Sequence, residues 1–201
     1  IGDVMRFLDN VLSDFINKAP EQFRDAKYSA ERERSVGLGV MGFHSFLQKK
    51  RIPLESVMAK SWNKKIFKNI HEKVNQASKD LAEERGACPD AAEYGFKERF
   101  SNKTAIAPTA SISIICGGAS PGVEPIAANS YTHKTLSGSF NVRNRYLEEI
   151  LESHGKNDDE IWSTITTNQG SVSHLDFLTD LEKDVFKTAF ELNQKWIIEL
   201  S

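Results

Sequence analysis

The sequence predicts an α/β fold with a largely parallel sheet that forms part of a barrel, because short apolar runs alternate with long amphipathic helices. Residues 35–43 (SVGLGVMGF) and 103–107 (KTAIA) have the composition of buried strands. Between them, residues 56–85 carry apolar side chains on one stripe and lysines and glutamates opposite. We therefore expect residues 36–40 and 104–107 to be strands of one sheet, with the helix that contains Trp62 and Ile70 packed on its outside.

The other elements follow from hydrophobic period and from turn residues. The chain opens on a helical pattern, and a second helix is expected to begin at about Gly42 and to end before Pro53. The charged residues 21–34 are expected to form a solvated connection with some helical character. Later patterns predict an extended segment followed by three helices, over residues 131–142, 146–151, 160–167 and 181–201.

Composition excludes several classes of function. The 26 basic and 28 acidic side chains nearly cancel, so no field of one sign exists to attract nucleic acid or an anionic membrane. Apolar stretches fall far short of the roughly 20 residues that a membrane helix needs, and residues 1–20 lack the layout of a signal peptide. Both ends fall inside helical patterns, and we expect each to be cut from a longer chain.

The two cysteines, Cys88 and Cys116, stand far apart in unrelated contexts, so they form neither a disulfide framework nor a zinc ligand set. Neither has an activating neighbour, and we expect both to be buried and inert. The five histidines lack the spacing of a metal pair on a helix, and His44, at a helix start, is expected to be packed or capping. These residues predict a reduced, cytoplasmic setting and no metal site.

Residues 37–42 (GLGVMG) match the dinucleotide fingerprint letter for letter. The fingerprint should follow a hydrophobic strand, however, and the residues before Gly37 are charged. The alternative is that these glycines allow a strand to pack tightly against its helix, and the context favours that alternative.

Residues 107–113 (APTASIS) have the layout of an anion site, because a short strand ends at a proline and hydroxyl residues follow at a helix start. Unpaired N–H groups of the first turn, the positive end of the helix dipole and the hydroxyls of Thr109, Ser111 and Ser113 could all face one phosphate. The pattern alone favours an ordinary helix cap by Thr109 or Ser111.

Six segments resemble, in order and spacing, the large, catalytic subunit of ribonucleotide reductase: residues 34–43 (RSVGLGVMGF), 84–89 (ERGACP), 107–113 (APTASIS), 120–125 (SPGVEP), 131–140 (YTHKTLSGSF) and 170–177 (GSVSHLDF). The last two look like class I large subunits of a bacterial type. The resemblance implies a ten-stranded α/β barrel built from two five-stranded halves. Residues 1–201 would then be a fragment of that domain, a partial barrel from its second half with long outer helices.

The resemblance also reverses the preference for a simple cap. Matched position by position, the family's substrate-phosphate loop falls on Thr109, Ala110, Ser111, Ile112 and Ser113. The family's finger-loop motif, asparagine-x-cysteine-x-glutamate, does not occur here, and the cysteine partner and the radical-relay tyrosines would lie outside residues 1–201. The resemblance therefore implies a ribonucleoside-diphosphate reductase whose catalytic residues lie elsewhere, and a segment that is inactive alone.

In the complete enzyme, the resemblance implies a ribonucleotide substrate, the remainder of the large subunit and a small, metal-bearing radical subunit as partners, with a dithiol as reductant. No cofactor is expected in this segment. Two alternatives stay open: the cobalamin-dependent class of the same enzyme, and a non-enzymatic module that binds phosphate ligands through residues 109–113.

Overall fold

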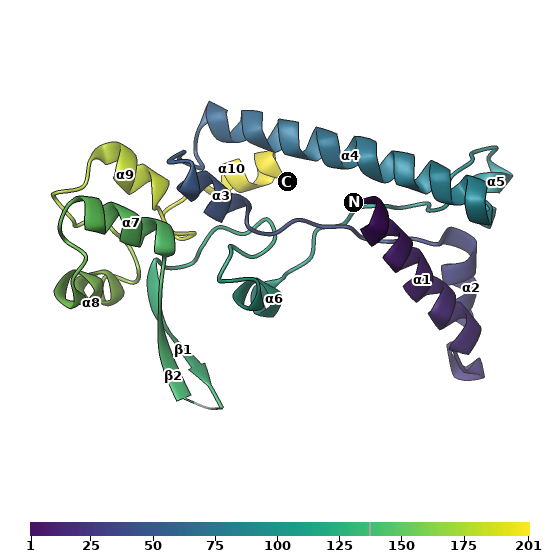
Figure 1. Cartoon of the computed structure of the whole chain (residues 1–201), viewed down its shortest axis with the longest axis horizontal. Helices are drawn as coiled ribbons and strands as arrows, with labels where there is room; N and C mark the ends of the chain where they lie inside the picture. Colours follow the sequence, from purple (N-terminus) through teal and green to yellow (C-terminus); the bar gives the residue numbers. More distant parts are fainter. Residues whose placement is uncertain (137) are drawn as a thin grey trace. The chain divides into compact units, whose positions relative to one another are not determined.

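The computed structural model describes residues 1–136 and 138–201 (Figure 1). The chain divides into two compact units: Ile1–Gly39 with Lys64–Ala107, and Val40–Asn63 with Pro108–Ser201. The first unit contains α1 (Gly2–Lys18), the 3-10 helix η1 (Glu21–Phe23), α2 (Arg24–Glu33), most of α4 (Val57–Arg85) and α5 (Pro89–Glu93). The second contains the start of α4 and α3 (Phe43–Lys49), α6 (Ala110–Ile115), β1 (Ser130–Thr135), β2 (Gly138–Arg143), α7 (Arg145–Ser153), α8 (Asp159–Thr167), α9 (Asp180–Val185) and α10 (Gln194–Leu200).

Helix α4 is the longest element in the described part of the chain, and its predicted period is confirmed. Its 29 residues, at 1.5 Å each, make a rod of about 43 Å. A helix of this length can contribute side chains to more than one hydrophobic core. Ile70 packs in the core of the first unit, whereas Trp62 packs in a core of the second unit, so the expectation that both cover one sheet is wrong.

The two predicted strands of the first unit pair in parallel, but over a shorter length than expected. Leu38 N–H donates to the Lys103 carbonyl at 3.0 Å, and Ala105 N–H donates to the Leu38 carbonyl at 3.2 Å. The only parallel pairing among the described residues is the Leu38–Thr104 bridge. Residues 104–107 are exposed, which corrects the prediction of a buried strand. Burial on both faces requires neighbouring strands and covering helices, and no third described segment pairs here.

The glycines of the fingerprint-like motif serve this close approach between chain segments. A Cβ on Gly39 would lie 2.8 Å from the Ala105 carbonyl oxygen, and one on Gly37 would lie 2.8 Å from the Ala105 Cβ. The expected close packing is confirmed, with the neighbouring extended segment in place of the expected helix.

We expect Gly39→Ala to lower the free energy of unfolding by about 1–3 kcal/mol, because the added methyl overlaps backbone that must shift. Urea unfolding followed by circular dichroism measures the change. Gly2→Ala is the matched control, since a Cβ at Gly2 meets nothing within 4 Å. Equal stability of the two variants would show that the motif is not constrained by packing.

A buried carboxylate organises the polar interior of the first unit. The Asp9 side chain is fully buried, and three arginines contact it. Its Oδ1 lies 2.6 Å from Arg34 Nη2 and 2.8 Å from Arg99 Nε, and its Oδ2 lies 2.8 Å from Arg85 Nη1. This Asp9 cluster joins α1, the end of α2, the end of α4 and the segment before the Thr104 bridge.

Residues 21–34 form η1 and α2, which confirms their predicted helical character, and neither helix contains a buried residue. Arg32 fastens α2 to α5 through Asp90 at 2.5 Å and Glu93 at 2.7 Å. These ion pairs join residues about 60 positions apart in sequence, which no local pattern reveals.

The second unit has two apolar cores. One lies among α7, α8, α9 and the segment that joins α8 to α9, and it includes the buried side chains of Trp162 and Phe186. The other joins α3, the start of α4 and α10. The predicted helix over residues 181–201 is interrupted: α9 ends at Val185 and α10 begins at Gln194. Between them, Thr188 N–H and hydroxyl both donate to Glu191 Oε2, a local side-chain bond that competes with helix.

The predicted extended segment is an antiparallel hairpin of β1 and β2, with Tyr131 opposite Val142. Ser137, within that prediction, lies outside the described residues. Asn129 and Asn144 close the base of the hairpin: Asn144 N–H donates to the Asn129 carbonyl and Asn144 Nδ2 donates to Asn129 Oδ1, both at 2.8 Å. The helices predicted at residues 146–151 and 160–167 are confirmed as α7 and α8.

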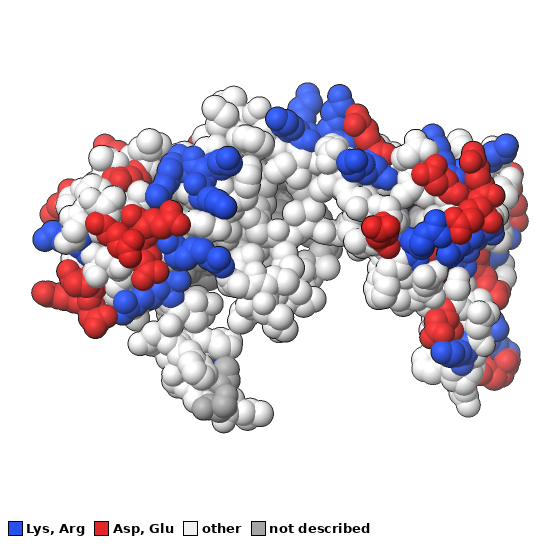
Figure 2. Space-filling view, viewed as in Figure 1, with Lys and Arg blue, Asp and Glu red and all other residues white. Residues whose placement is uncertain are grey.

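Basic and acidic side chains are interspersed on the face shown in Figure 2, as the near balance of charges predicts. Across the described residues, every helix is too short or too polar to cross a membrane.

Candidate functional site

The predicted phosphate loop lies in the second unit, where Thr109 immediately precedes the first turn of α6. The N–H groups of Ala110, Ser111 and Ile112 occupy the first three positions of the helix, where no carbonyl within the helix can accept them. Within the described structure, the Thr109 side chain does not cap them. The loop therefore presents three adjacent backbone donors.

The three hydroxyls of the loop differ in what they can still donate. Thr109 Oγ1 accepts the Gly122 N–H at 2.7 Å, which leaves its own proton for a ligand. Ser111 is exposed, and its hydroxyl has no hydrogen-bond partner among the described residues. Ser113 is buried; its hydroxyl donates to the Ala110 carbonyl and its N–H to the Thr109 carbonyl, both at 2.8 Å. Ser113 thus holds the shape of the loop.

The loop carries no charge of its own. No Asp, Glu, Lys or Arg occurs between Lys103 and Glu124. One cation contacts the segment just after α6: Arg145, at the start of α7, donates from its guanidinium to the Gly117 carbonyl. An anion held by residues 109–113 would therefore be bound by neutral donors and by the helix dipole.

The start of α3 supports the segment that follows α6. Ser45 and Ser120 exchange two hydrogen bonds: Ser120 N–H donates to Ser45 Oγ at 2.8 Å, and Ser45 N–H donates to Ser120 Oγ at 3.2 Å. His44 Nδ1 accepts the Ile126 N–H at 3.0 Å. Burial lowers the pKa of His44 to about 4, so the ring is neutral at pH 7 and can accept this bond.

His44 was expected to be packed or capping, and it is packed. Sequence reasoning missed Ser45 and Ser120, although a serine at the third position of a helix that begins after glycine is a weak sign of such a contact. The cysteines divide: Cys88 is buried as expected, whereas Cys116 is exposed. Cys116 directly follows the last residue of α6.

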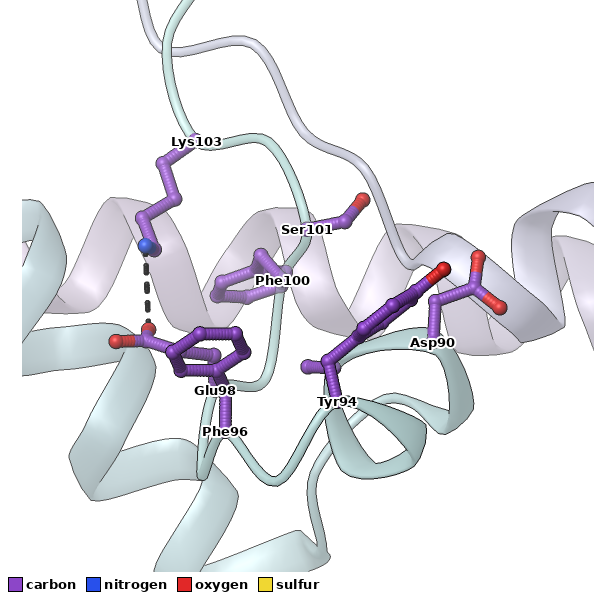
Figure 3. A pocket seen from close by; sticks show the side chains of 8 residues that line it. Asp90, Tyr94, Phe96, Glu98, Phe100, Ser101 and Lys103 are labelled. Atoms are coloured by element: carbon purple, nitrogen blue, oxygen red, sulfur yellow. Dashed lines mark ion pairs between the residues drawn. The ribbon is translucent and has the colours of Figure 1, made fainter.

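The first unit contains a cavity of about 300 Å³ (Figure 3). Tyr94 and Phe96 line it with Phe100, and its charged groups are already paired. Glu98 lies 3.2 Å from Lys103, and Asp90 is bound to Arg32. No group of three or more potential metal ligands occurs in the described part of the chain. The loop at residues 109–113 is the better candidate because its donors are unpaired.

These features define an α/β protein in which an uncharged loop leads into a short helix, α6, whose first three N–H groups have no acceptor within the helix. The chain belongs to the family described as the ribonucleotide reductase barrel domain, which it matches over residues 1–99 and 90–201.

Relatives agree with that assignment. The chain is 49% identical, over 99% of its length, to the ribonucleoside-diphosphate reductase large subunit of Invertebrate iridescent virus 6, and covers 21% of that protein. It is 34% identical, over 95% of its length, to a vitamin B12-dependent ribonucleoside-diphosphate reductase of Thermoplasma acidophilum, and covers 25% of it. The class Id ribonucleotide reductase alpha subunit of Actinobacillus ureae superposes on 99% of the chain with a TM-score of 0.90 and 40% identity. The chain covers 36% of that structure. It thus spans about a fifth to a third of these relatives.

Proposed function

We propose that residues 1–201 form the second-half part of a ten-stranded barrel in the catalytic subunit of a class I ribonucleoside-diphosphate reductase. The parallel pairing of Leu38 with Thr104 and the long helix α4 suit such a barrel segment with outer helices. The likeness to the class Id alpha subunit supports class I over the cobalamin-dependent class. The family membership disfavours a stand-alone phosphate-binding module.

The role proposed for this segment is to hold the substrate's phosphates at Thr109, Ala110, Ser111, Ile112 and Ser113. The observation that carries it is the set of three adjacent first-turn N–H groups beside the free protons of Thr109 and Ser111. Ser113 belongs to the loop as the residue that closes its first turn. A ribonucleotide's phosphates accept such bonds well, because hydrogen bonds to a charged acceptor are the stronger ones.

In the complete enzyme, a thiyl radical would remove the ribose 3′ hydrogen, a cysteine pair would supply two electrons and the 2′ hydroxyl would leave as water. We assign none of these steps to residues of this chain. The complete cytoplasmic enzyme would need the remainder of the large subunit, a small metal-bearing subunit that generates the radical, and a dithiol reductant. The contribution here is position: misplacing the ribose by about 1 Å could cost a hundredfold in rate.

We expect Ser111→Ala, placed in a complete large subunit, to weaken substrate binding by about 1.5–3 kcal/mol, because one hydrogen bond to a charged acceptor is lost. Ile112→Pro should weaken it further, since proline removes an N–H that the helix does not use and the phosphate does. The measurement is the substrate KM, with turnover recorded beside it.

The design separates binding from folding. Ser111 is exposed and its hydroxyl makes no hydrogen bond to a described residue, so Ser111→Ala should unfold at the same urea concentration as the wild type. Ser113→Ala is the matched control, because it breaks the bond to the Ala110 carbonyl and should lower stability. If Ser111→Ala and Ile112→Pro fold normally and keep the wild-type KM and turnover, the loop is only a helix start and the proposed site is wrong.

A further inference from the structure

The first turn of α3 contains N–H groups that no carbonyl of the same helix can accept. Ser45 is the third residue of α3, and its N–H has no acceptor within the helix. Ser120, 75 residues later, supplies that acceptor with its hydroxyl. Gly42, the residue before the helix, donates its N–H to the Ser120 carbonyl at 2.7 Å. Ser120 therefore caps α3 through the tertiary structure, with both serines buried.

A second attachment lies six residues further along. His44 is 2% exposed, and its Nδ1 accepts the Ile126 N–H. Residues 120–126 are thus held to α3 at both ends. Between the attachments, Glu124 N–H donates to the Pro121 carbonyl at 2.8 Å and closes a turn.

The turn so held contacts the candidate site directly. Gly122, buried within it, donates its N–H to Thr109 Oγ1 at 2.7 Å. A hydroxyl that accepts this bond keeps its own proton to donate, and Thr109 directly precedes Ala110 and Ser111, whose N–H groups have no acceptor within the helix. The path from α3 to the loop therefore consists of named hydrogen bonds, each 3.2 Å or shorter.

We propose that His44, Ser45 and Ser120 are positioning residues for phosphate binding: they fix residues 120–126, and Gly122 in turn orients the Thr109 hydroxyl toward the anion. This inference rests on the proposed function. None of the three touches the phosphate, and each acts through Gly122. The inference adds residues from α3, more than 60 positions before the loop, to the determinants of substrate affinity.

The test uses a complete large subunit that carries these residues, with inorganic pyrophosphate as the probe at constant pH. Backbone amide NMR shifts at Ala110, Ser111 and Ile112 report binding. His44→Leu cannot accept the Ile126 N–H. It should raise the dissociation constant about threefold to tenfold, because the Thr109 hydroxyl would no longer be oriented to donate one hydrogen bond to the anion. His44→Asn is its matched control, because its side-chain oxygen can accept the same N–H, and it should bind within about twofold of the wild type.

Ser45→Ala removes the acceptor of the Ser120 N–H and should act like His44→Leu, and it carries the test if the leucine variant does not fold. Ile165→Val, in the apolar core among α7, α8 and α9, lowers stability without touching this path and should leave the dissociation constant unchanged. A purely structural role for His44 predicts that the leucine and valine variants behave alike.

The outcomes separate the two proposals. If the wild type shows no shift at these amides, or Ser111→Ala binds as the wild type does, the proposed phosphate site is wrong and the positioning inference falls with it. If Ser111→Ala weakens binding while folded His44→Leu and Ser45→Ala bind like the wild type, only the positioning inference is overturned.

Discussion

Replacing Asp9 by Asn should lower the free energy of unfolding by about 3–5 kcal/mol, the cost of removing one partner from a buried ionic cluster. The Asp9 carboxylate is fully buried and is the only acidic member of the described Asp9 cluster, facing Arg34, Arg85 and Arg99. An amide of the same shape leaves the two buried arginines, Arg34 and Arg99, without their counter-charge. It also loses acceptor capacity at the Oδ2 position, where Arg85 Nη1 donates.

The measurement can separate the two units. All three tryptophans, Trp62, Trp162 and Trp196, lie in the second unit, whereas circular dichroism also reports α1 and α2 in the first. Asp9→Asn should shift the urea midpoint seen by circular dichroism more than the midpoint seen by tryptophan fluorescence. Asp14→Asn is the matched control on the same helix. Asp14 pairs with Lys18 in the open, where an ion pair contributes about 0–1 kcal/mol.

The stabilisation by the Asp9 carboxylate depends on pH. Burial alone would raise the pKa of Asp9, but hydrogen bonds from Arg99, Arg34 and Arg85 outweigh burial and hold that pKa below its usual value. The stabilisation is therefore complete above the unfolded pKa of about 3.9 and is lost as the pH falls through the lower folded pKa. A loss of 0.5 kcal/mol or less for Asp9→Asn at pH 7 would show that the cluster does not stabilise the fold.

Stability of the second unit should fall by about 3 kcal/mol between pH 6.5 and pH 4 because of His44 alone. Burial lowers the pKa of His44 to about 4, against about 6.5 in an unfolded chain. In this window the unfolded chain takes up a proton at His44 that the folded chain does not. The unfolded state therefore binds more protons, and stability decreases as the pH decreases.

The check is a series of urea unfolding curves from pH 8 to pH 4, followed by tryptophan fluorescence. His44→Asn keeps an acceptor for the Ile126 N–H and removes the titration, so the variant should lose less stability than the wild type across this range. His71→Asn, on the exposed side of α4 in the first unit, makes the same change in composition and serves as the control. Identical pH profiles for the wild type and His44→Asn would contradict the prediction.

The candidate phosphate loop shows which structural features a local sequence pattern can predict and which it cannot. A proline after a short extended run, followed by hydroxyl residues, indicated a helix start at the right place, and α6 begins at Ala110. The pattern did not reveal that the Ser113 hydroxyl donates to the Ala110 carbonyl, or that the Thr109 hydroxyl accepts the Gly122 N–H. A hydroxyl's direction depends on which partner the fold brings near, and Gly122 is 13 residues away.

The strand predictions show the opposite limit. The composition of residues 35–43 and 103–107 predicted two strands of one sheet, and the structure joins them by a single parallel bridge at Leu38 and Thr104. Apolar composition indicates that a segment suits burial between neighbours, but the neighbours themselves determine whether a ladder forms. Residues 181–201 give a second example. Their helical period is continuous, but the helix is interrupted where Thr188 donates to the Glu191 side chain.

By itself, the sequence determined the helical period of α1 and α4, the positions of α7 and α8, the glycine requirement at residues 37 and 39, and the position of the candidate loop. These properties depend on side-chain spacing, on backbone freedom and on caps within a few residues. Only the tertiary structure decided which polar groups meet: Asp9 with arginines 25, 76 and 90 residues away, and Ser45 with Ser120 across 75 residues. The physical reason is that burial makes an unpaired charge or N–H group costly, so distant partners are selected by the packed fold as a whole, and no local stretch of sequence records that selection.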